Sequence, residues 1–172
     1  MNRFFAGFLC LALLTPAAMA ADSAVLLGDF KNWSAYSATI DGHQVCYALS
    51  EPRAKEPKTA RRDPIYFLVN DWPGRHAKAE AEIVPGYKYK DGEVVTVAVG
   101  GDKFSFFARN DGNEGSAWVQ VLADGPKLID AMNHGLSAVV TGTSSRGTVT
   151  RDTYSLAGFD DAVGKIHASC GM

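Results

Sequence analysis

Short apolar stretches of strand length, separated by turn signals, run through most of this chain of 172 residues. Residues 33–40 and 44–50 flank Asp41-Gly42-His43, and an Asp-Gly turn between two such stretches is typical of a β-hairpin. Residues 65–69 form a continuous apolar run, as in a strand that is covered on both faces. Further strands are expected at 79–84, at 94–99, from 104 onward, and at 117–122, 136–143 and 148–156. In the first of these, Glu80 and Glu82 are expected to face solvent. Residues 110–116 have the composition of a loop. The spacing of the turns predicts an all-β fold, an antiparallel β-sandwich or barrel-like domain.

Two short helices are expected within this pattern. Pro126 suits the first turn of a helix and Gly135 its end, and Leu128 and Met132 would share one face. A second helix is indicated near the C-terminus by apolar residues at helical spacing, namely Phe159, Ala162, Val163, Ile166 and Cys170. We expect this helix to pack its apolar stripe onto the sheet.

The N-terminus has the features of a secretory signal peptide. Arg3 precedes an apolar run over residues 4–14, and Ala18-Met19-Ala20 supplies the small-x-small pattern that signal peptidase recognises. The run is too short for a membrane-spanning helix, which requires about 20 residues. We therefore expect residues 1–20 to be removed and residues 21–172 to form one exported domain, located in the periplasm, at the outer membrane or outside the cell.

Two cysteines remain in the expected mature chain, Cys46 and Cys170. An even pair of cysteines in an exported protein is most simply a disulfide, because the bacterial periplasm is oxidising. There is no C-x-x-C motif of the redox type, and no further zinc ligand stands at the required spacing from either cysteine. The sequence therefore predicts a structural disulfide and neither a metal ion nor a cofactor.

The charge of the chain argues against nucleic acid as a partner. The sequence has 17 basic and 19 acidic residues, a formal net charge of −2. So small a charge does not favour nucleic acid or an anionic membrane as the main partner. The basic residues within 51–63 are diluted by acidic ones, and this segment is expected to be an exposed, solvated connection.

The most distinctive loop is expected at residues 144–147. A nucleophile elbow requires G-x-S-x-G between a strand and a helix, but here the last glycine is missing and a strand follows. A phosphate-binding loop requires a lysine where Thr148 stands. The pattern favours a hairpin turn with Gly147 at positive φ. Ser144, Ser145 and Arg146 are then candidate residues for contact with a partner.

No catalytic residue is assigned from the sequence. The histidines lack the spacing of a metal site, and the tryptophans are more typical of a core or of hairpins than of a sugar-binding platform. These residues are His43, His76, His134 and His167, and Trp33, Trp72 and Trp118.

Several segments resemble the invasion-associated locus B family. They are CYALSEP at 46–52, YFLV at 66–69, AMNHG at 131–135, SSRGTVTRDTYSLAGFDDA at 144–162, and the terminal Cys170. The resemblance covers the whole mature chain, and its last third is the most specific part. It implies a protein exported from Gram-negative bacteria to the periplasm or outer membrane, which in pathogens helps entry into host cells. It brings no established catalytic residues.

The sequence thus predicts an exported protein that is not an enzyme and that works by binding a protein or a component of the cell envelope. The alternative is an exported hydrolase or a carbohydrate-binding protein, with a site assembled from distant residues. A deep pocket with convergent polar groups and a histidine would favour that alternative.

Overall fold

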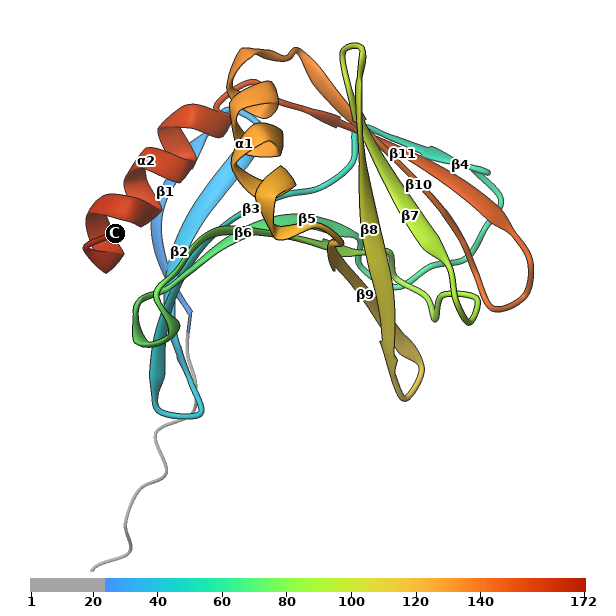
Figure 1. Cartoon of the computed structure of the whole chain (residues 1–172), viewed down its shortest axis with the longest axis horizontal. Coiled ribbons are helices and arrows are strands. Elements are labelled where there is room, and N and C mark those ends of the chain that lie inside the picture. Colours follow the sequence, from blue (N-terminus) through green and yellow to red (C-terminus); the bar gives the residue numbers. More distant parts are fainter. Residues whose placement is uncertain (1–23) are drawn as a thin grey trace, which may run out of the picture.

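The computed structural model describes residues 24–172, and the predicted signal peptide, residues 1–20, lies outside that range. Within the described residues, eleven antiparallel strands form one sheet in the order β1-β2-β3-β5-β6-β9-β8-β7-β10-β11-β4 (Figure 1). The strands are β1 Val25–Phe30, β2 Trp33–Ile40, β3 His43–Ser50, β4 Ala54–Glu56, β5 Tyr66–Trp72, β6 Ala77–Val84, β7 Val94–Val99, β8 Asp102–Asp111, β9 Glu114–Val119, β10 Ser137–Thr143 and β11 Val149–Ser155. The helices are α1 Gly125–His134 and α2 Phe159–Cys170, and short 3-10 turns occupy η1 Pro73–Arg75 and η2 Leu122–Asp124.

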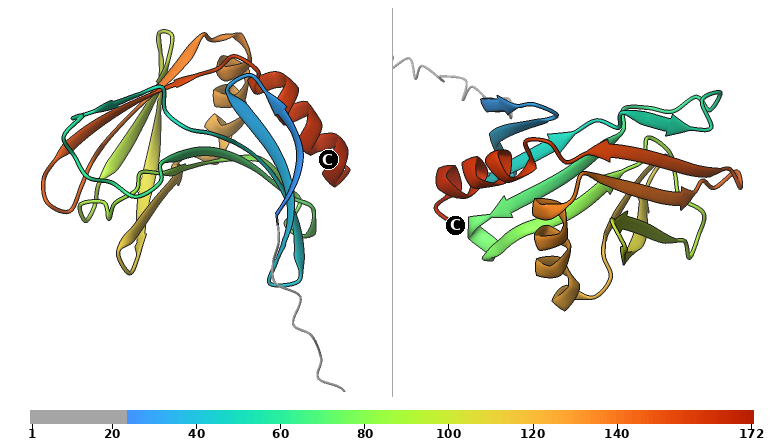
Figure 2. Two further views of the ribbon diagram at one scale, coloured as in Figure 1. Left: turned by 180° about the vertical axis from the view of Figure 1, so that it is seen from behind. Right: turned by 90° about the horizontal axis from the view of Figure 1, so that it is seen from above.

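The sheet bends so strongly that its two halves face each other across one core (Figure 2). The indole N–H of Trp33, on β2, donates to the carbonyl of Ser155, on β11, over 2.9 Å. Phe67 on β5 meets Tyr154 on β11 edge to face, with ring centroids 5.5 Å apart. The sheet does not close, because β1 and β4 remain at opposite ends of the strand order. The predicted all-β, sandwich-like fold is thereby confirmed.

The two predicted helices are present, and each buries the face that its sequence indicates. In α1, Leu128 and Met132 are fully buried, while α2 buries its whole apolar stripe. Figure 1 shows α2 lying along the β1–β2 side of the sheet and α1 standing between the two halves. Neither helix of residues 24–172 is long and apolar enough to cross a bilayer.

The start and the end of α2 are fixed by covalent and steric constraints. Gly158 precedes the helix with φ +91°, and a Cβ at this position would lie 1.9 Å from the carbonyl oxygen of Phe30. Only glycine fits so close to the β1–β2 turn. At the other end, Cys170 is bonded to Cys46 of β3 with the Cα atoms 6.0 Å apart. The predicted disulfide is therefore present and ties the C-terminal helix to the sheet.

Some expectations from the sequence are wrong in detail. Residues 110–116 are not a loop, because β8 and β9 pair as far as Asp111 and Glu114 and leave a two-residue turn with Gly112 at φ +55°. The connection over 51–63 contains β4, which pairs with β11. Glu82 does not face open solvent, since it is half-buried and accepts a hydrogen bond from the amide of Asn70. In each case strand pairing outweighs the local composition, and for β4 the partner strand is distant in the sequence.

Candidate functional site

The loop with the two serines is a hairpin turn between β10 and β11. The N–H of Gly147 donates to the carbonyl of Ser144, and the N–H of Ser144 donates to the carbonyl of Thr148, over 2.8 and 2.9 Å. Gly147 has φ +82°, as the turn requires. The Oγ of Ser144 accepts the N–H of Thr148, and this serine is 4% exposed. A partner can therefore reach Ser145 and Arg146, which are exposed, but not Ser144.

Backbone hydrogen bonds hold this hairpin against the segment that joins β6 to β7. The N–H of Ser145 donates to the carbonyl of Lys88 over 2.7 Å, and the N–H of Lys90 donates to the carbonyl of Thr143 over 2.9 Å. These bonds bring Arg146 and Lys88 to the same edge of the molecule, although they are far apart in sequence. Backbone hydrogen bonds thus set where the main chain of both residues lies, and their exposed side chains carry the charges.

Arg146 and Lys88 line a cavity of about 430 Å³ that also receives the segment after β4. We call this cavity the basic pocket. It is lined by Arg61, Arg62, Asp63, Gly86, Tyr87, Lys88, Asn113, Ser144, Ser145 and Arg146. Arg61, Lys88 and Arg146 are exposed, and none of them forms a salt bridge within residues 24–172. Three cations face one carboxylate there, that of Asp63, so the pocket favours an anionic group.

The inner wall of the basic pocket is a buried ion pair. Nη1 and Nη2 of Arg62 donate to the two carboxylate oxygens of Asp152 over 2.7 and 2.6 Å, and Nε donates to the carbonyl of Pro85 over 2.9 Å. The side chains of the pair are 5% and 3% exposed. Burial by itself would lower the pKa of Arg62, but the hydrogen bonds and charge of Asp152 raise it above its ordinary value. Arg62 is therefore charged and already neutralised, and it is not a solvated residue of the connection as the sequence indicated.

Aromatic hydroxyls surround this ion pair. The guanidinium of Arg62 lies over the ring of Tyr87 at 5.0 Å, and the hydroxyl of Tyr87 is 2.7 Å from Oγ1 of Thr150. The hydroxyls of Tyr89 and Tyr154 are buried and have no hydrogen-bond partner among the described residues. Burial raises the pKa of both tyrosines well above the ordinary value, so they stay protonated. This cluster is a rigid support behind the pocket.

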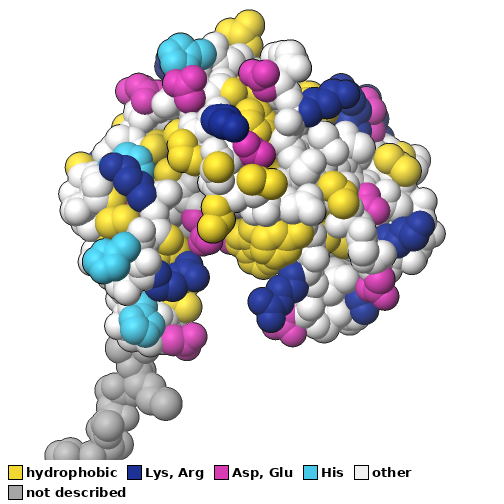
Figure 3. All heavy atoms as spheres, viewed as in Figure 1, with side chains coloured by type: hydrophobic (Ala, Val, Ile, Leu, Met, Phe, Trp, Pro, Cys, Tyr) yellow, Lys and Arg dark blue, Asp and Glu magenta, His cyan; other side chains and the backbone are white. Residues whose placement is uncertain are grey.

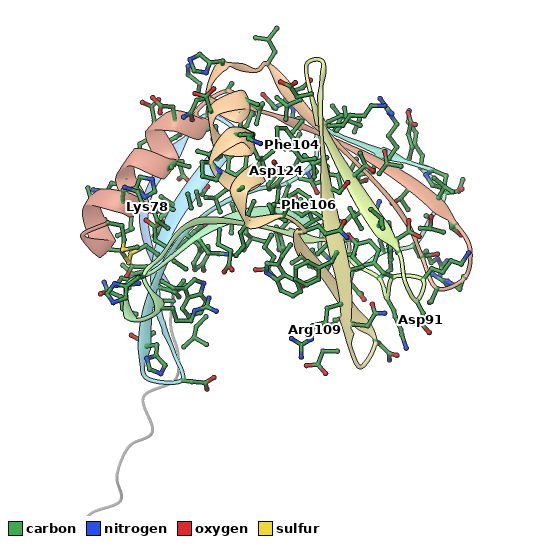
Figure 4. The ribbon with its side chains drawn as sticks, in the orientation of Figure 1. Lys78, Asp91, Phe104, Phe106, Arg109 and Asp124 are labelled. Carbon is green, nitrogen blue, oxygen red and sulfur yellow. A yellow bond between two sulfur atoms is a disulfide. The ribbon has the colours of Figure 1, made fainter. Side chains whose placement is uncertain are left out.

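A second concavity, of about 720 Å³, lies where β6 and β9 diverge. We call it the apolar groove. Its lining includes Ala77–Ala81 of β6, Phe107, Trp118, Leu122, Ile129 of α1 and His167 of α2. Figure 3 shows hydrophobic side chains gathered in a hollow on this face of the molecule. Phe104 and Phe106 project from β8 toward α1 into the core (Figure 4), whereas Phe107 is 45% exposed.

One polar constellation borders the apolar groove. Nδ1 of His167 lies 2.6 Å from Oδ2 of Asp71, which is fully buried, and Oδ1 of Asp71 accepts the N–H of Ala79 over 2.8 Å. Ala79 has φ +53° at a register shift between β5 and β6. The carboxylate of Asp71 thus connects α2 to the register shift in β6. Its hydrogen bond helps to hold Ala79 in the left-handed region, which a residue other than glycine rarely adopts.

The structure separates most of the other residues that the sequence singles out. His43 lies in the β2–β3 hairpin, His76 ends η1, and His134 ends α1, with Nδ1 2.8 Å from the carbonyl of Asp130. No group of three or more metal-ligating side chains forms within the described part of the chain. Trp33 is in the core, as expected, but Trp118 is half-buried on the wall of the apolar groove.

Sequence reasoning missed both the Arg62–Asp152 pair and the Asp71–His167 contact. Their members are 90 and 96 residues apart, and no local pattern joins them. A carboxylate directly after an apolar run, as at Asp71, is the one signal that could have drawn attention to the second pair.

Comparisons with known proteins now place this architecture. The family model described as "Invasion associated locus B (IalB) protein" matches residues 33–167. A search of curated proteins finds no match. Among solved structures, the crystal structure of invasion associated protein B from Bartonella henselae is similar, with a TM-score of 0.59 and 13% identity over 84% of this chain and 96% of that chain. So low an identity shows a shared fold alone. Because the family model covers most of its length, the chain belongs to the invasion-associated locus B family.

Proposed function

We propose that residues 21–172 form an exported binding protein of the bacterial cell envelope, whose partner presents an anionic group to the basic pocket. The observation that carries this proposal is that Arg61, Lys88 and Arg146 converge on one cavity without salt-bridge partners of their own in the described chain. Unneutralised cations in a concave site attract a complementary partner and orient it.

Several further observations support this proposal. The signal-peptide pattern, the disulfide and the family membership all fit a protein that works outside the cytoplasm. The buried Arg62–Asp152 pair and the backbone hydrogen bonds of the hairpin position the segments that carry the three cations. The partner is a protein or an envelope component. In a pathogen, such binding would serve entry into host cells, as the family name implies.

Charge reversal in the basic pocket tests the proposal. Purified mature protein is added to washed envelope fractions of the source bacterium, and the bound share is measured at low and at moderate salt. We expect Lys88→Glu and Arg146→Glu to reduce binding strongly and the wild type to lose binding as salt rises. The matched control is Lys165→Glu, because Lys165 is an exposed lysine on α2 outside the pocket. Equal binding by all variants would contradict the role of the pocket.

Export is tested separately from binding. N-terminal sequencing of the native protein from the periplasmic or culture fraction should begin at Ala21, or at Asp22 if cleavage slips by one residue. Native protein that keeps Met1 and is absent from those fractions would refute the export proposal and leave the binding test unaffected.

The alternative, an exported hydrolase or carbohydrate-binding protein, is favoured by one observation, the His167–Asp71 contact beside the apolar groove. A carboxylate that orients a histidine is part of many hydrolytic sites. However, the residues that line the groove include no serine, threonine or cysteine, so the nucleophile of a serine- or cysteine-type hydrolase is missing there. Hydrolysis of chromogenic esters or glycosides by the wild type, lost in His167→Ala, would establish the alternative; the absence of hydrolysis would leave the binding proposal preferred.

A further inference from the structure

The apolar groove contains a strand edge that no other strand covers. β6 pairs with β5 from Ala77 to Val84, with a register shift between Ala77 and Glu80, but it pairs with β9 only through Glu82–Trp118 and Ile83–Ala117. Beyond this point the chain after β9 stays with β8, because the N–H of Gln120 donates to the carbonyl of Ser105. Within the described residues, the side of Ala77–Ala81 that faces away from β5 therefore has no strand partner.

The walls beside this open edge are apolar, and they are exposed or half-buried. Phe107 and Trp118 are cross-strand neighbours with ring centroids 5.7 Å apart, and Ile129 of α1 lines the groove as well. Leu122 is 90% exposed at its margin. Large apolar side chains clustered in a concave surface mark a binding site more often than isolated exposed ones do.

The charges on the rim select against a strongly charged ligand. Lys78 contributes one positive charge, while Glu80 and Asp130 contribute negative charges. Glu80 is already 3.2 Å from a guanidinium nitrogen of Arg75. Because neither sign dominates, the groove is complementary to a segment that is uncharged along its length, unlike the basic pocket.

We infer that the apolar groove binds an extended polypeptide segment, which adds a strand to the open edge of β6 and places alternate apolar side chains against Phe107, Trp118 and Leu122. A lipid chain could contact the apolar walls of the groove, but it has no backbone N–H or C=O groups to pair with the open edge of β6. The edge over residues 77–81 includes the bulge at Ala79 and spans at most about 17 Å, which suits a strand of four or five residues. Strand addition of this kind takes its affinity from main-chain hydrogen bonds and its specificity from alternate side chains.

This inference goes beyond the proposed function, because it concerns a surface separate from the basic pocket, and either site can fail its test while the other stands. The probe is a set of fluorescein-labelled heptapeptides in which Val, Leu, Ile or Phe alternates with Thr. Binding of the set to the purified mature protein is measured by fluorescence anisotropy. We expect saturable binding of at least one peptide, and binding by none would overturn the inference.

Two leucines at opposite ends of α1 provide matched variants. Leu122 lines the groove, and Leu136, which is 92% exposed, does not. Both side chains lie in solvent, so neither Leu122→Asp nor Leu136→Asp should disturb folding. We expect Leu122→Asp to weaken peptide binding about tenfold or more, since a buried leucine contact is lost and a charge is placed in the groove. Leu136→Asp should leave binding unchanged, and equal effects of the two variants would refute the site.

The strand-pairing geometry is tested on the peptide itself. N-methylation of alternate residues removes the donors along one edge of a peptide while its side chains remain. One of the two methylated series should lose binding, and amides within residues 77–81 should become protected from hydrogen exchange when the unmethylated peptide is added. Binding that survives both methylation series would show apolar contact without strand addition and would overturn the inference.

Two other occupants are distinguished in the same experiments. Binding of phosphatidylcholine vesicles that Leu122→Asp abolishes, with no peptide binding, would assign the groove to lipid. A dimer in sedimentation that Leu122→Asp dissociates and Leu136→Asp does not would assign it to a second copy of this chain. Either result would overturn the inference.

Discussion

Replacement of Arg62 by methionine should strongly destabilise the fold. Methionine keeps much of the apolar stem that packs near Tyr87, but it removes both hydrogen bonds to Asp152, at 2.7 and 2.6 Å. The carboxylate of Asp152 would then be unpaired in a site where its side chain is 3% exposed. Removal of one partner of a buried ion pair destabilises a protein by roughly 3–5 kcal/mol. For a domain of this size that corresponds to a fall in Tm of roughly 6–20 °C.

The assay is urea unfolding followed by tryptophan fluorescence, with the disulfide intact in every variant. Arg61→Met is the matched control, because Arg61 is the adjacent arginine and is exposed. A surface change of this kind should alter the free energy of unfolding by less than about 0.5 kcal/mol. The double variant Arg62→Met/Asp152→Leu should recover most of the lost stability, since it leaves no buried charge unpaired.

Two results would refute this reasoning. If Arg62→Met is as mild as Arg61→Met, the ion pair is solvated and does not support the wall of the basic pocket. If the double variant is as unstable as the single one, the loss comes from packing rather than from an unpaired carboxylate.

Three further predictions concern the disulfide, the half-buried Glu82 and two glycines. Replacing both Cys46 and Cys170 by alanine should lower the free energy of unfolding by about 5 kcal/mol on the chain-entropy model, because the bridge joins residues 124 apart. Native protein that reacts with a thiol reagent before reduction would contradict the presence of the disulfide. Burial raises the pKa of Glu82, so the native state binds this proton more tightly than the unfolded state and stability falls as pH rises through the folded pKa. Glu82→Gln should reduce that fall in urea titrations between acid and neutral pH, and an unchanged pH dependence would disprove the assignment. Gly147→Ala should lower the free energy of unfolding by only on the order of 1 kcal/mol, since φ is +82° but no atom lies within 4 Å of the added Cβ. Gly158→Ala should lower it distinctly more, because its Cβ would meet the backbone of β1. Equal melting temperatures of the two variants would refute this difference.

The local elements of this protein could be predicted from short stretches of its sequence. Residues that are neighbours along the chain specify the Asp41-Gly42 turn, the lengths of the two strands beside it and the apolar stripe of α2. Such patterns are readable because a turn or an amphipathic helix depends on side chains within one or two turns of one another. The cysteine pair was also predictable, since removal of the predicted signal peptide would leave two cysteines and one internal bridge.

The candidate sites, in contrast, were decided by the tertiary structure. The hairpin that carries Ser145 and Arg146 was predicted. Lys88 reaches this hairpin through backbone hydrogen bonds between the hairpin and the segment before β7, and Arg61 reaches it because the adjacent Arg62 is buried against Asp152. The apolar groove exists because β6 and β9 part after two residue pairs, and nothing within β6 indicates where its neighbour leaves it. A strand's own residues specify which side chains face in and out, whereas the partner on each edge is chosen by the packing of the whole sheet, so an open edge cannot be read from the strand that carries it.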